Sequence, residues 1–441
     1  MALFRGMPQE IRDHIVDLMS DDQSALAAIG SVHRSFTGRS QRLLFSDVTL
    51  TMSATVFLFH RAIQNTSLRG IVKVLHVRTS ISGASWIAHD VTLPTVLTKL
   101  YGLVEFHFRP MSLCLSTSSP ALNQAFYRVL SLPSLRVLEV IGVRSLLLSR
   151  IAGAVHLHDV RLAHVEFQDE MWRLERVSPP NLISLTLILD AHAMRRACLL
   201  LMDHEDQQPS TSVQLRRLRL DLVSSKDIAE GYAGAAYILS RCASCLRDLE
   251  LGGFLCPNLQ SQVVRLEICF ERVQVPAVTS LAFRDILVGA ADNVEPLSRW
   301  LTFLLRRIPN VEHAAIQLRI LRRTLGSIAD SARLLHAEEF ISAFRRQSSS
   351  SGVSSLASVH FYALRPRHLL DMDSEVLPRV RQDLAVLADG HVKVSLNLLH
   401  ALVRGVLKAG IPQHDAFMSK GNPHSAQASV RQILTLQVLS F

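Results

Sequence analysis

The chain has 441 residues, more than one compact core usually holds, and 48% of them are hydrophobic, which predicts two globular units or one elongated repeat array. It shows no charge-free run of about 18 apolar residues, no secretory-type leader and only six cysteines, so we expect no membrane contact, no signal peptide and no disulfide framework. A cytoplasmic or nuclear location is therefore expected.

The chain is basic, with a formal net charge of +9, and 41 of its 47 basic residues are arginine. Arginine suits phosphate and carboxylate partners because its guanidinium group is a planar fork, although the codon bias of a GC-rich genome gives the same surplus. The charges are scattered and aromatic residues make up only 6%. Because stacking platforms for bases are scarce, we do not expect a nucleic-acid partner.

Residues 7–50 predict three short helices. Apolar side chains recur at helical spacing at Ile11, Ile15, Leu18 and Met19, which are predicted to form one stripe of a first helix. Asp21, Asp22 and Ser24 offer capping oxygens to a second helix, and a third helical stretch follows over residues 32–45. Three helices in fewer than fifty residues bury little apolar surface. We therefore expect this module, residues 1–50, to lean on the rest of the chain, on a partner, or on both.

The order of residues in this stretch resembles the F-box, especially its fungal version. Met7-Pro8-Gln9-Glu10-Ile11 matches the family's Leu-Pro-x-Glu-Ile-like start, and residues 32–36 match its Val-x-Arg-x-aromatic segment. Residues 44–50 match its Leu-Phe-x-x-Val-x-Leu ending. Three positions depart from the family pattern: Met7 replaces the usual Leu, His33 a common Cys, and Phe36 the usual Trp.

The resemblance implies a three-helix F-box that binds a small Skp-type adaptor and, through it, a cullin-RING ubiquitin ligase. The residues implied to bind the adaptor are Met7, Pro8, Glu10, Ile11, Ile15, Leu18, Leu26, Val32, Phe36 and Leu43. The alternative is an N-terminal cap whose apolar stripe is covered by the chain's own following domain.

The remainder, residues 51–441, contains a repeated motif of the form apolar-x-x-apolar-x-apolar, as in VKVLHV (72–77) and LRDLEL (246–251). Copies begin at residues 72, 103, 135, 157, 182, 215, 246, 278, 311, 356 and 391, with four successive steps of 33, 31, 32 and 33 residues. Helical patterns lie between the motifs at residues 53–66, 227–244, 293–308 and 331–347. One strand and one helix per repeat predict a leucine-rich-repeat-like solenoid.

The predicted fold is therefore α/β: an N-terminal three-helix F-box followed by an irregular horseshoe with a parallel sheet on its concave side. We expect irregularity because the sites where regular repeats place Asn or Cys are mostly apolar here, as at Val143 and Val223. The run at 347–355 reads as a flexible insert, and residues 412–425 read as a loop.

The side chains between the apolar motif positions are predicted to form the exposed concave surface. The candidate substrate-binding residues are His76, Arg78, His107, Arg109, Glu139, Arg161, Arg217, Arg219, Glu250, Arg284, His360 and Tyr362. Neighbouring outward positions are Glu105, Asp159, Asp221, Asp248, His313 and Gln317. A basic cluster of Arg161, Arg217 and Arg219 suits an acidic or phosphorylated segment. The alternative is that these are ordinary solvated strand residues.

Catalytic, cofactor and metal sites are not expected. Cys242-x-x-Cys245 has the spacing of half a zinc site, but Cys256 and Cys269 do not form a second close pair, so buried thiols are the preferred interpretation. No nucleophile elbow, phosphate-binding loop or dinucleotide fingerprint is present.

The functional hypothesis is a non-enzymatic substrate-recognition subunit of a Skp-cullin-F-box type ubiquitin ligase, in which the solenoid binds an unknown target protein. A repeat scaffold for protein–protein interaction without any ligase function is the alternative of a different class. A third class, an enzyme whose site is assembled from distant repeats, has no support in the residues.

Overall fold

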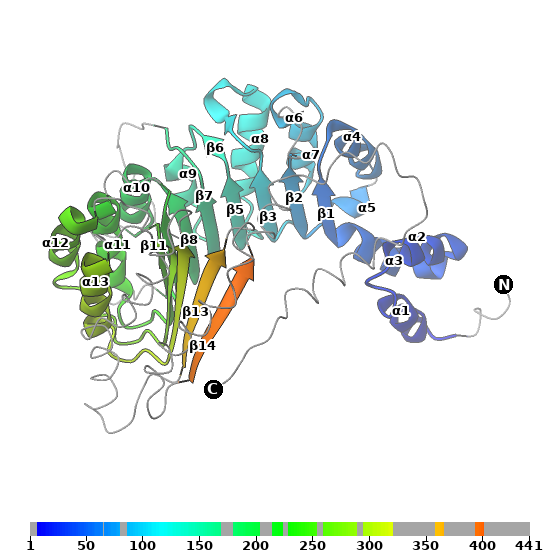
Figure 1. Cartoon of the computed structure of the whole chain (residues 1–441). Helices are drawn as coiled ribbons and strands as arrows, with labels where there is room; N and C mark the ends of the chain where they lie inside the picture. The colour runs from blue at the N-terminus through cyan, green and yellow to red at the C-terminus, as the bar shows by residue number, and fades with distance from the viewer. Residues whose placement is uncertain are drawn as a thin grey trace. The chain divides into compact units, whose positions relative to one another are not determined.

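The strands form where the sequence repeats its apolar motif, and they pair in parallel because a helical or looped crossover separates each from the next. The computed structural model describes residues 7–64, 66–79, 86–168, 180–202, 214–223, 228–253, 259–288, 294–320, 358–365 and 393–400 (Figure 1). The chain divides into two units, Met1–Leu182 and Ile183–Phe441, and this boundary falls inside the region that the sequence predicts as one solenoid. Both units are α/β with parallel strands, which confirms the predicted class.

The first unit begins with three helices, α1 (Gln9–Asp17), α2 (Gln23–Val32) and α3 (Arg34–Ser46). Its main sheet has the order β1-β2-β3-β5-β7, and every neighbouring pair is parallel. These strands are β1 (Asp47–Leu50), β2 (Val74–Arg78), β3 (Glu105–Arg109), β5 (Val137–Ile141) and β7 (Asp159–Ala163). The helices between them are α4 (Ser53–Ala62), α5 (Thr66–Arg69), α6 (Trp86–His89), α7 (Leu93–Lys99), α8 (Pro120–Leu130) and α9 (Leu148–Ala152).

A second, two-stranded parallel sheet marks the corner after the main strands of this unit. It pairs β4 (Leu113–Cys114) with β6 (Val143–Arg144), and a short 3-10 turn, η2 (Leu115–Thr117), follows β4. Gly142 joins β5 to β6 with a φ of 72°, a conformation that costs glycine little because it has no Cβ. Its carbonyl accepts a hydrogen bond from the backbone N–H of Ser112 at 2.7 Å, which ties the two corners together.

The described residues of the second unit form parallel strands that follow one another in chain order. They are β8 (Ser184–Leu189), β9 (Arg217–Leu222), β10 (Asp248–Gly252), β11 (Ser280–Val288), β12 (His313–Ile320), β13 (Ser358–Arg365) and β14 (Lys393–His400). The helices described between them are α10 (Ala191–Met202), α11 (Ile228–Cys242), α12 (Leu259–Phe270) and α13 (Val294–Arg307). These four helices lie together on one side of the strands of this unit (Figure 1).

In both units, alternate strand residues face the helices and form the core. Leu75, Val77, Phe106 and Phe108 are all fully buried in the first unit, and the leucines of β8, β9 and β10 are buried in the second. The intervening residues are mostly polar and half-buried, with apolar exceptions such as Val137 and Ile188, as expected for a sheet that is covered on one face. Among the described residues, none of the helices combines the length and the apolar character needed to cross a membrane.

All eleven sequence motifs overlap strands, and the four nearly equal steps connect β8 to β12. The helices predicted at 227–244 and 293–308 are found as α11 and α13. The pattern at 53–66 gives α4, which ends at Ala62, before the separate short helix α5. The predicted helix at 331–347, the insert at 347–355 and the loop at 412–425 lie outside the described residues.

Candidate functional site

The three N-terminal helices form a small core of their own. Val16, Leu26 and Phe36, one from each helix, have at most 1% of their surface exposed. The Asp22 carboxylate caps α2 by accepting hydrogen bonds from the backbone N–H groups of residues 24 and 25, as the sequence predicts. Arg39 Nε lies 2.6 Å from Asp17 Oδ1, which links α3 to the end of α1. The module is therefore held together by its own residues.

The opposite side of α1 carries an exposed apolar stripe. Ile11 is 49% exposed and Leu18 is 75% exposed, while Ile15 between them is half-buried. At about 100° per residue, these three side chains fall within an arc of about 60°, and Val16 points about 100° or more away from them. The stripe of Ile11, Ile15 and Leu18 therefore belongs to a different face from the core. Met19, the fourth residue of the predicted stripe, packs against the core instead. Val32, at the end of α2, adds a further apolar side chain that is 49% exposed.

The residues implied by the F-box resemblance thus divide into a surface group and a core group. Pro8, Glu10, Ile11, Leu18 and Val32 are exposed. Met7, Ile15 and Leu43 are half-buried. Leu26 and Phe36 are buried in the core of the module, where they support the surface and have no exposed area with which to contact a partner.

A row of polar side chains crosses the exposed face of the first unit's sheet. His76, His107, Glu139 and Arg161 are in register on β2, β3, β5 and β7. The rings of His76 and His107 are stacked, with their centroids 4.4 Å apart and an angle of 17° between their planes. Because equivalent motif positions in successive repeats stand side by side, the repeat itself assembles this row.

Glu139 is the centre of this row. Its side chain is only 4% exposed, yet it is an ionisable group. His107 Nδ1 lies 2.9 Å from Glu139 Oε2, Arg109 Nε donates to the same oxygen at 2.8 Å, and Arg161 lies 3.0 Å from Oε1. Burial opposes ionisation of the carboxyl, but the hydrogen bonds and charges of these partners outweigh it and lower the pKa of Glu139 to about 2.

The two stacked histidines have opposite pKa shifts. The hydrogen bond to Glu139 raises the pKa of His107, against the effect of burial, and a second contact to Glu105 at 3.3 Å adds to it. Burial lowers the pKa of His76, and the charge of His107 lowers it further. The pKa values of the two stacked rings are therefore driven apart, which disfavours two adjacent imidazolium charges.

The second unit has a corresponding ion-pair cluster on the polar face of β9, β10 and β11. Arg284 contacts both oxygens of Glu250, at 2.6 Å and 3.1 Å, in a bidentate arrangement. Arg219 lies 3.6 Å from Glu250 and 3.5 Å from Asp221. Arg219 and Arg284 are therefore both matched by Glu250 of the repeat between them.

Two of the three arginines in the predicted basic cluster form ion pairs with carboxylates of the chain. Arg161 belongs to the first unit, whereas Arg217 and Arg219 belong to β9 in the second. Arg161 and Arg219 each face a carboxylate of the chain, and Arg217 is exposed. Elsewhere, Arg78 is exposed at the end of β2. His360 and Tyr362 lie on β13, in register with residues 315 and 317 of β12.

The cross-strand contacts of Glu139 with His107 and Arg161 were not predicted from the sequence, although the sequence contains a signal for them. The same motif position carries His, His, Glu and Arg in four successive repeats. Because parallel strands in register place equivalent positions next to each other, reading these letters across the repeats instead of along the chain identifies Glu139 as the acid between basic neighbours.

The cysteines of the second unit occupy separate places. Cys242 is buried at the end of α11, and burial raises the pKa of its thiol. The Cys245 thiol donates to the carbonyl of Leu215 at 3.3 Å, and Cys269 lies on α12. Cys256 lies outside the described residues. Within the part of the chain that the structure describes, no three His, Cys, Asp or Glu side chains are grouped so that they could hold a metal ion.

No protein-family model matches the chain, and no curated protein matches it.

Proposed function

We propose that the chain is the substrate-recognition subunit of a Skp-cullin-F-box type ubiquitin ligase. In this proposal, α1–α3 form an F-box that docks a Skp-type adaptor, and the strands that follow belong to an irregular leucine-rich-repeat-like solenoid that binds the target protein. The observation that carries the proposal is the apolar stripe of α1, which stays exposed although the module already has a core of its own.

The stripe supports docking because of its spacing as well as its exposure. Isolated apolar side chains are common on protein surfaces, but Ile11, Ile15 and Leu18 follow one another at helical intervals. Such a series is what a groove on a partner recognises when it receives one face of a helix. Covering a fully exposed aliphatic side chain stabilises a complex by about 1.5–3 kcal/mol. Ile11 and Leu18 are 49% and 75% exposed, so each would contribute a part of this when a partner covers α1.

The polar strand faces support a role in binding target proteins. Their charges are held in fixed positions by cross-strand ion pairs, as at Glu139 and Glu250. A mixed-charge face of this kind favours specificity and correct orientation of a partner over raw affinity. In this proposal the chain performs no chemistry itself. It acts by tethering the target, which raises the target's effective concentration near the transferring enzyme. The role implies a cytoplasmic or nuclear location.

Co-purification tests the adaptor proposal. We expect Leu18→Asp to reduce recovery of a co-expressed Skp-type adaptor at least tenfold, because it places a charge in a buried apolar contact. Leu18 is 75% exposed, so the substitution leaves the fold intact, and circular dichroism checks this. The matched control is Val91→Asp, which introduces the same charge at a side chain 86% exposed in the same unit.

Equal adaptor recovery by the parent chain and the Leu18→Asp variant would contradict the proposal. It would favour a repeat scaffold without ligase function instead.

A further inference from the structure

Two arginines lie side by side on the polar face of the first unit. Arg78 ends β2 and Arg109 ends β3, and the two residues are in register. Neighbouring strands lie about 4.8 Å apart, so the fold keeps two positive charges close to each other, where they repel. We call Arg78 and Arg109 the arginine pair.

The acid that contacts the arginine pair is already shared. Glu139 contacts Arg109, Arg161 and His107. Among the residues that the structure describes, Arg78 contacts no carboxylate. One carboxylate among three arginines leaves an excess of positive charge around Glu139.

Three further acids of this face lie at the opposite end of the strands. Asp47, Glu105 and Asp159 occupy one level of the sheet, at the start of β1, β3 and β7. Glu105 precedes Arg109 by four residues on β3, which corresponds to about 13 Å along a strand. Salt screens exposed charges that are more than about 8 Å apart at physiological ionic strength. These acids therefore leave the arginine pair uncompensated.

The titration of His76 reflects the same excess of positive charge. His76 lies two residues before Arg78 on the same face of β2. Burial is the largest cause that lowers the pKa of His76, and the charges of His107, Arg109 and Arg78 lower it further, although Asp47 raises it. The arginine pair thus acts on a ring that already contacts an acid.

An apolar side chain continues this level of the sheet on the next strand. Ile141 ends β5 on the polar face and is half-buried, and the residue before it, Val140, is in register with Phe108 of β3. The centre of the arginine pair lies about 7 Å from Ile141, one and a half strand spacings. Alternate residues of an extended chain are about 6.6 Å apart. An extended segment that crosses the strands therefore places an acid over the pair and an apolar side chain over Ile141.

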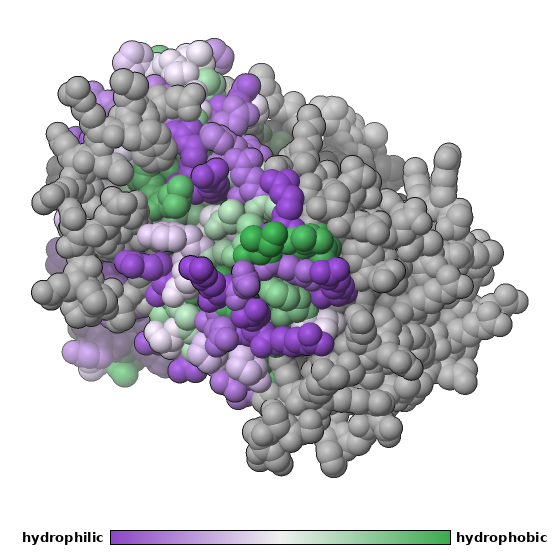
Figure 2. All heavy atoms as spheres, turned by 90° about the vertical axis from the view of Figure 1, so that its left-hand side faces the viewer, coloured by the Kyte–Doolittle hydropathy of each residue, from purple (hydrophilic) through white to green (hydrophobic). Residues whose placement is uncertain are grey.

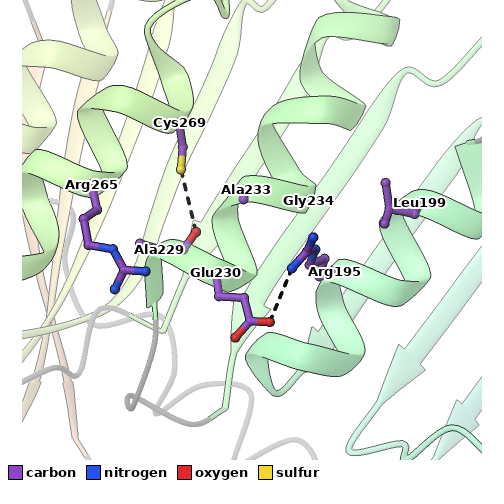
Figure 3. A pocket seen from close by; sticks show the side chains of 8 residues that line it. All are labelled: Arg195, Leu199, Ala229, Glu230, Ala233, Gly234, Arg265 and Cys269. Atoms are coloured by element: carbon purple, nitrogen blue, oxygen red, sulfur yellow. Dashed lines mark hydrogen bonds and ion pairs between the residues drawn. The ribbon is translucent and has the colours of Figure 1, made fainter. Parts of the chain in front are cut away.

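Arg195, which lines a pocket of the second unit, is placed differently. This pocket of about 520 Å³ is lined by residues of α10, α11 and α12 (Figure 3), and Arg195 Nη1 lies 3.7 Å from Glu230 Oε1. Figure 2, which views the molecule from the side of α12 and α13, shows hydrophobic side chains among hydrophilic ones. An acid of the chain therefore already faces Arg195, whereas Arg78 faces a second arginine.

We propose that the arginine pair binds a carboxylate in an extended acidic segment of the target protein, with an apolar side chain two residues from the acid packed over Ile141. The guanidinium groups match a carboxylate in charge and in geometry, and the carboxylate relieves the repulsion between them. The inference rests on the proposed function in assigning this segment to a target of the ligase. It adds the chemistry of that target, an acidic and an apolar residue separated by one position.

Peptide selection on the full chain tests this recognition. The probe is a displayed library of random peptides of about 12 residues, long enough to cross the strands of the first unit. We expect the parent chain to enrich peptides in which Asp or Glu lies two residues from an apolar residue. Binding of a selected peptide, measured by fluorescence anisotropy, is expected to weaken as salt is raised and to weaken about tenfold when its acid is replaced by the neutral amide.

One variant of the chain locates the site. Arg78→Gln removes an exposed charge and is expected to weaken binding of the selected peptide about tenfold. Because it also removes repulsion with Arg109, it is expected not to lower the urea midpoint of unfolding. The matched control is Arg128→Gln, which removes the same charge from an exposed position on α8 and is expected to bind as the parent does.

The proposal is overturned if the parent chain enriches no such peptides, if Arg78→Gln binds the selected peptide as well as Arg128→Gln does, or if Arg78→Gln lowers the urea midpoint. It is also overturned if an oligodeoxythymidine binds the parent chain and not Arg78→Gln, since the occupant would then be a nucleic acid. The selection contains no adaptor. Adaptor binding can therefore fail while the peptide result stands, and the segment would then belong to a partner of a repeat scaffold.

Discussion

At the scale of single residues, Glu139 is the central group of the polar row on the first unit's sheet. It is a nearly buried acid whose charge is balanced by His107, Arg109 and Arg161. Removing one member of a buried ion-pair network costs more than the network contributes, because the remaining charges lose their counter-ion. Glu139 is therefore a structural element of the charged face, and a partner would contact the exposed arginines around it.

The lowered pKa of Glu139 predicts a pH-dependent stability. The carboxyl titrates at about 2 in the folded chain, against a reference value of 4.5. Its contribution is therefore complete above pH 4.5 and is lost as the pH falls toward about 2. Glu139→Gln is expected to lower the free energy of unfolding of the first unit by about 3 kcal/mol at neutral pH. Urea unfolding of both chains at several pH values measures this, and the difference between them should shrink on acidification.

His107 acts in the opposite direction. Its pKa is raised, first by the hydrogen bond to Glu139. The contribution of His107 to stability is therefore complete below pH 6.5 and is lost as the pH rises through the raised native value.

The matched control for Glu139→Gln is Glu105→Gln, because Glu105 also contacts His107 but is 39% exposed. This control should cost under about 1 kcal/mol. A Glu139→Gln effect no larger than that of the control would refute the assignment of Glu139 as the centre of the network.

At the scale of elements, the three N-terminal helices form a module whose core is very small. Phe36 fills this core and is 1% exposed, so Phe36→Ala is expected to cost about 3–5 kcal/mol of local stability. We expect the amides of α1–α3 to lose their protection from hydrogen exchange, while those of β2, β3 and β5 keep theirs, because the sheet has its own core. Hydrogen exchange followed by mass spectrometry measures both regions in one experiment.

Phe57→Ala is the control for this variant, because Phe57 lies on α4 and is 55% exposed. It should leave the protection of α1–α3 unchanged. If Phe36→Ala instead left α1–α3 protected, the core of the module would have to lie elsewhere.

Periodicity predicts most of these elements, because it reports which side chains are buried. The spacing of apolar residues identifies α1, β2, β3, β5 and the strands from β7 onward, but not β1, β4 or β6. The sequence offers Asp21, Asp22 and Ser24 as caps of α2, and the structure selects Asp22. The stripe of α1 is also evident as an apolar series. Periodicity does not reveal which of Val16 and Leu18 faces the core, because both are apolar and only packing against Leu26 and Phe36 decides.

At the scale of the whole molecule, the repeat explains the class of fold but not the arrangement of charges. Parallel strands follow from motif copies separated by about thirty residues. The ion pairs join side chains about one repeat apart in sequence, such as Arg284 and Glu250, so they depend on the register between strands. The pocket lined by residues of α10, α11 and α12 depends on side chains of three neighbouring helices, which no single repeat contains. Both features therefore require the folded chain.

The central claim is that α1–α3 receive the adaptor, and hydrogen exchange of the full chain with and without a purified Skp-type adaptor tests it most directly. The account predicts slower exchange over residues 9–46 when the adaptor is added, with no change in α10–α12. The same experiment with Leu18→Asp should show no slowing. Unchanged exchange over residues 9–46 of the parent chain at saturating adaptor would contradict the account.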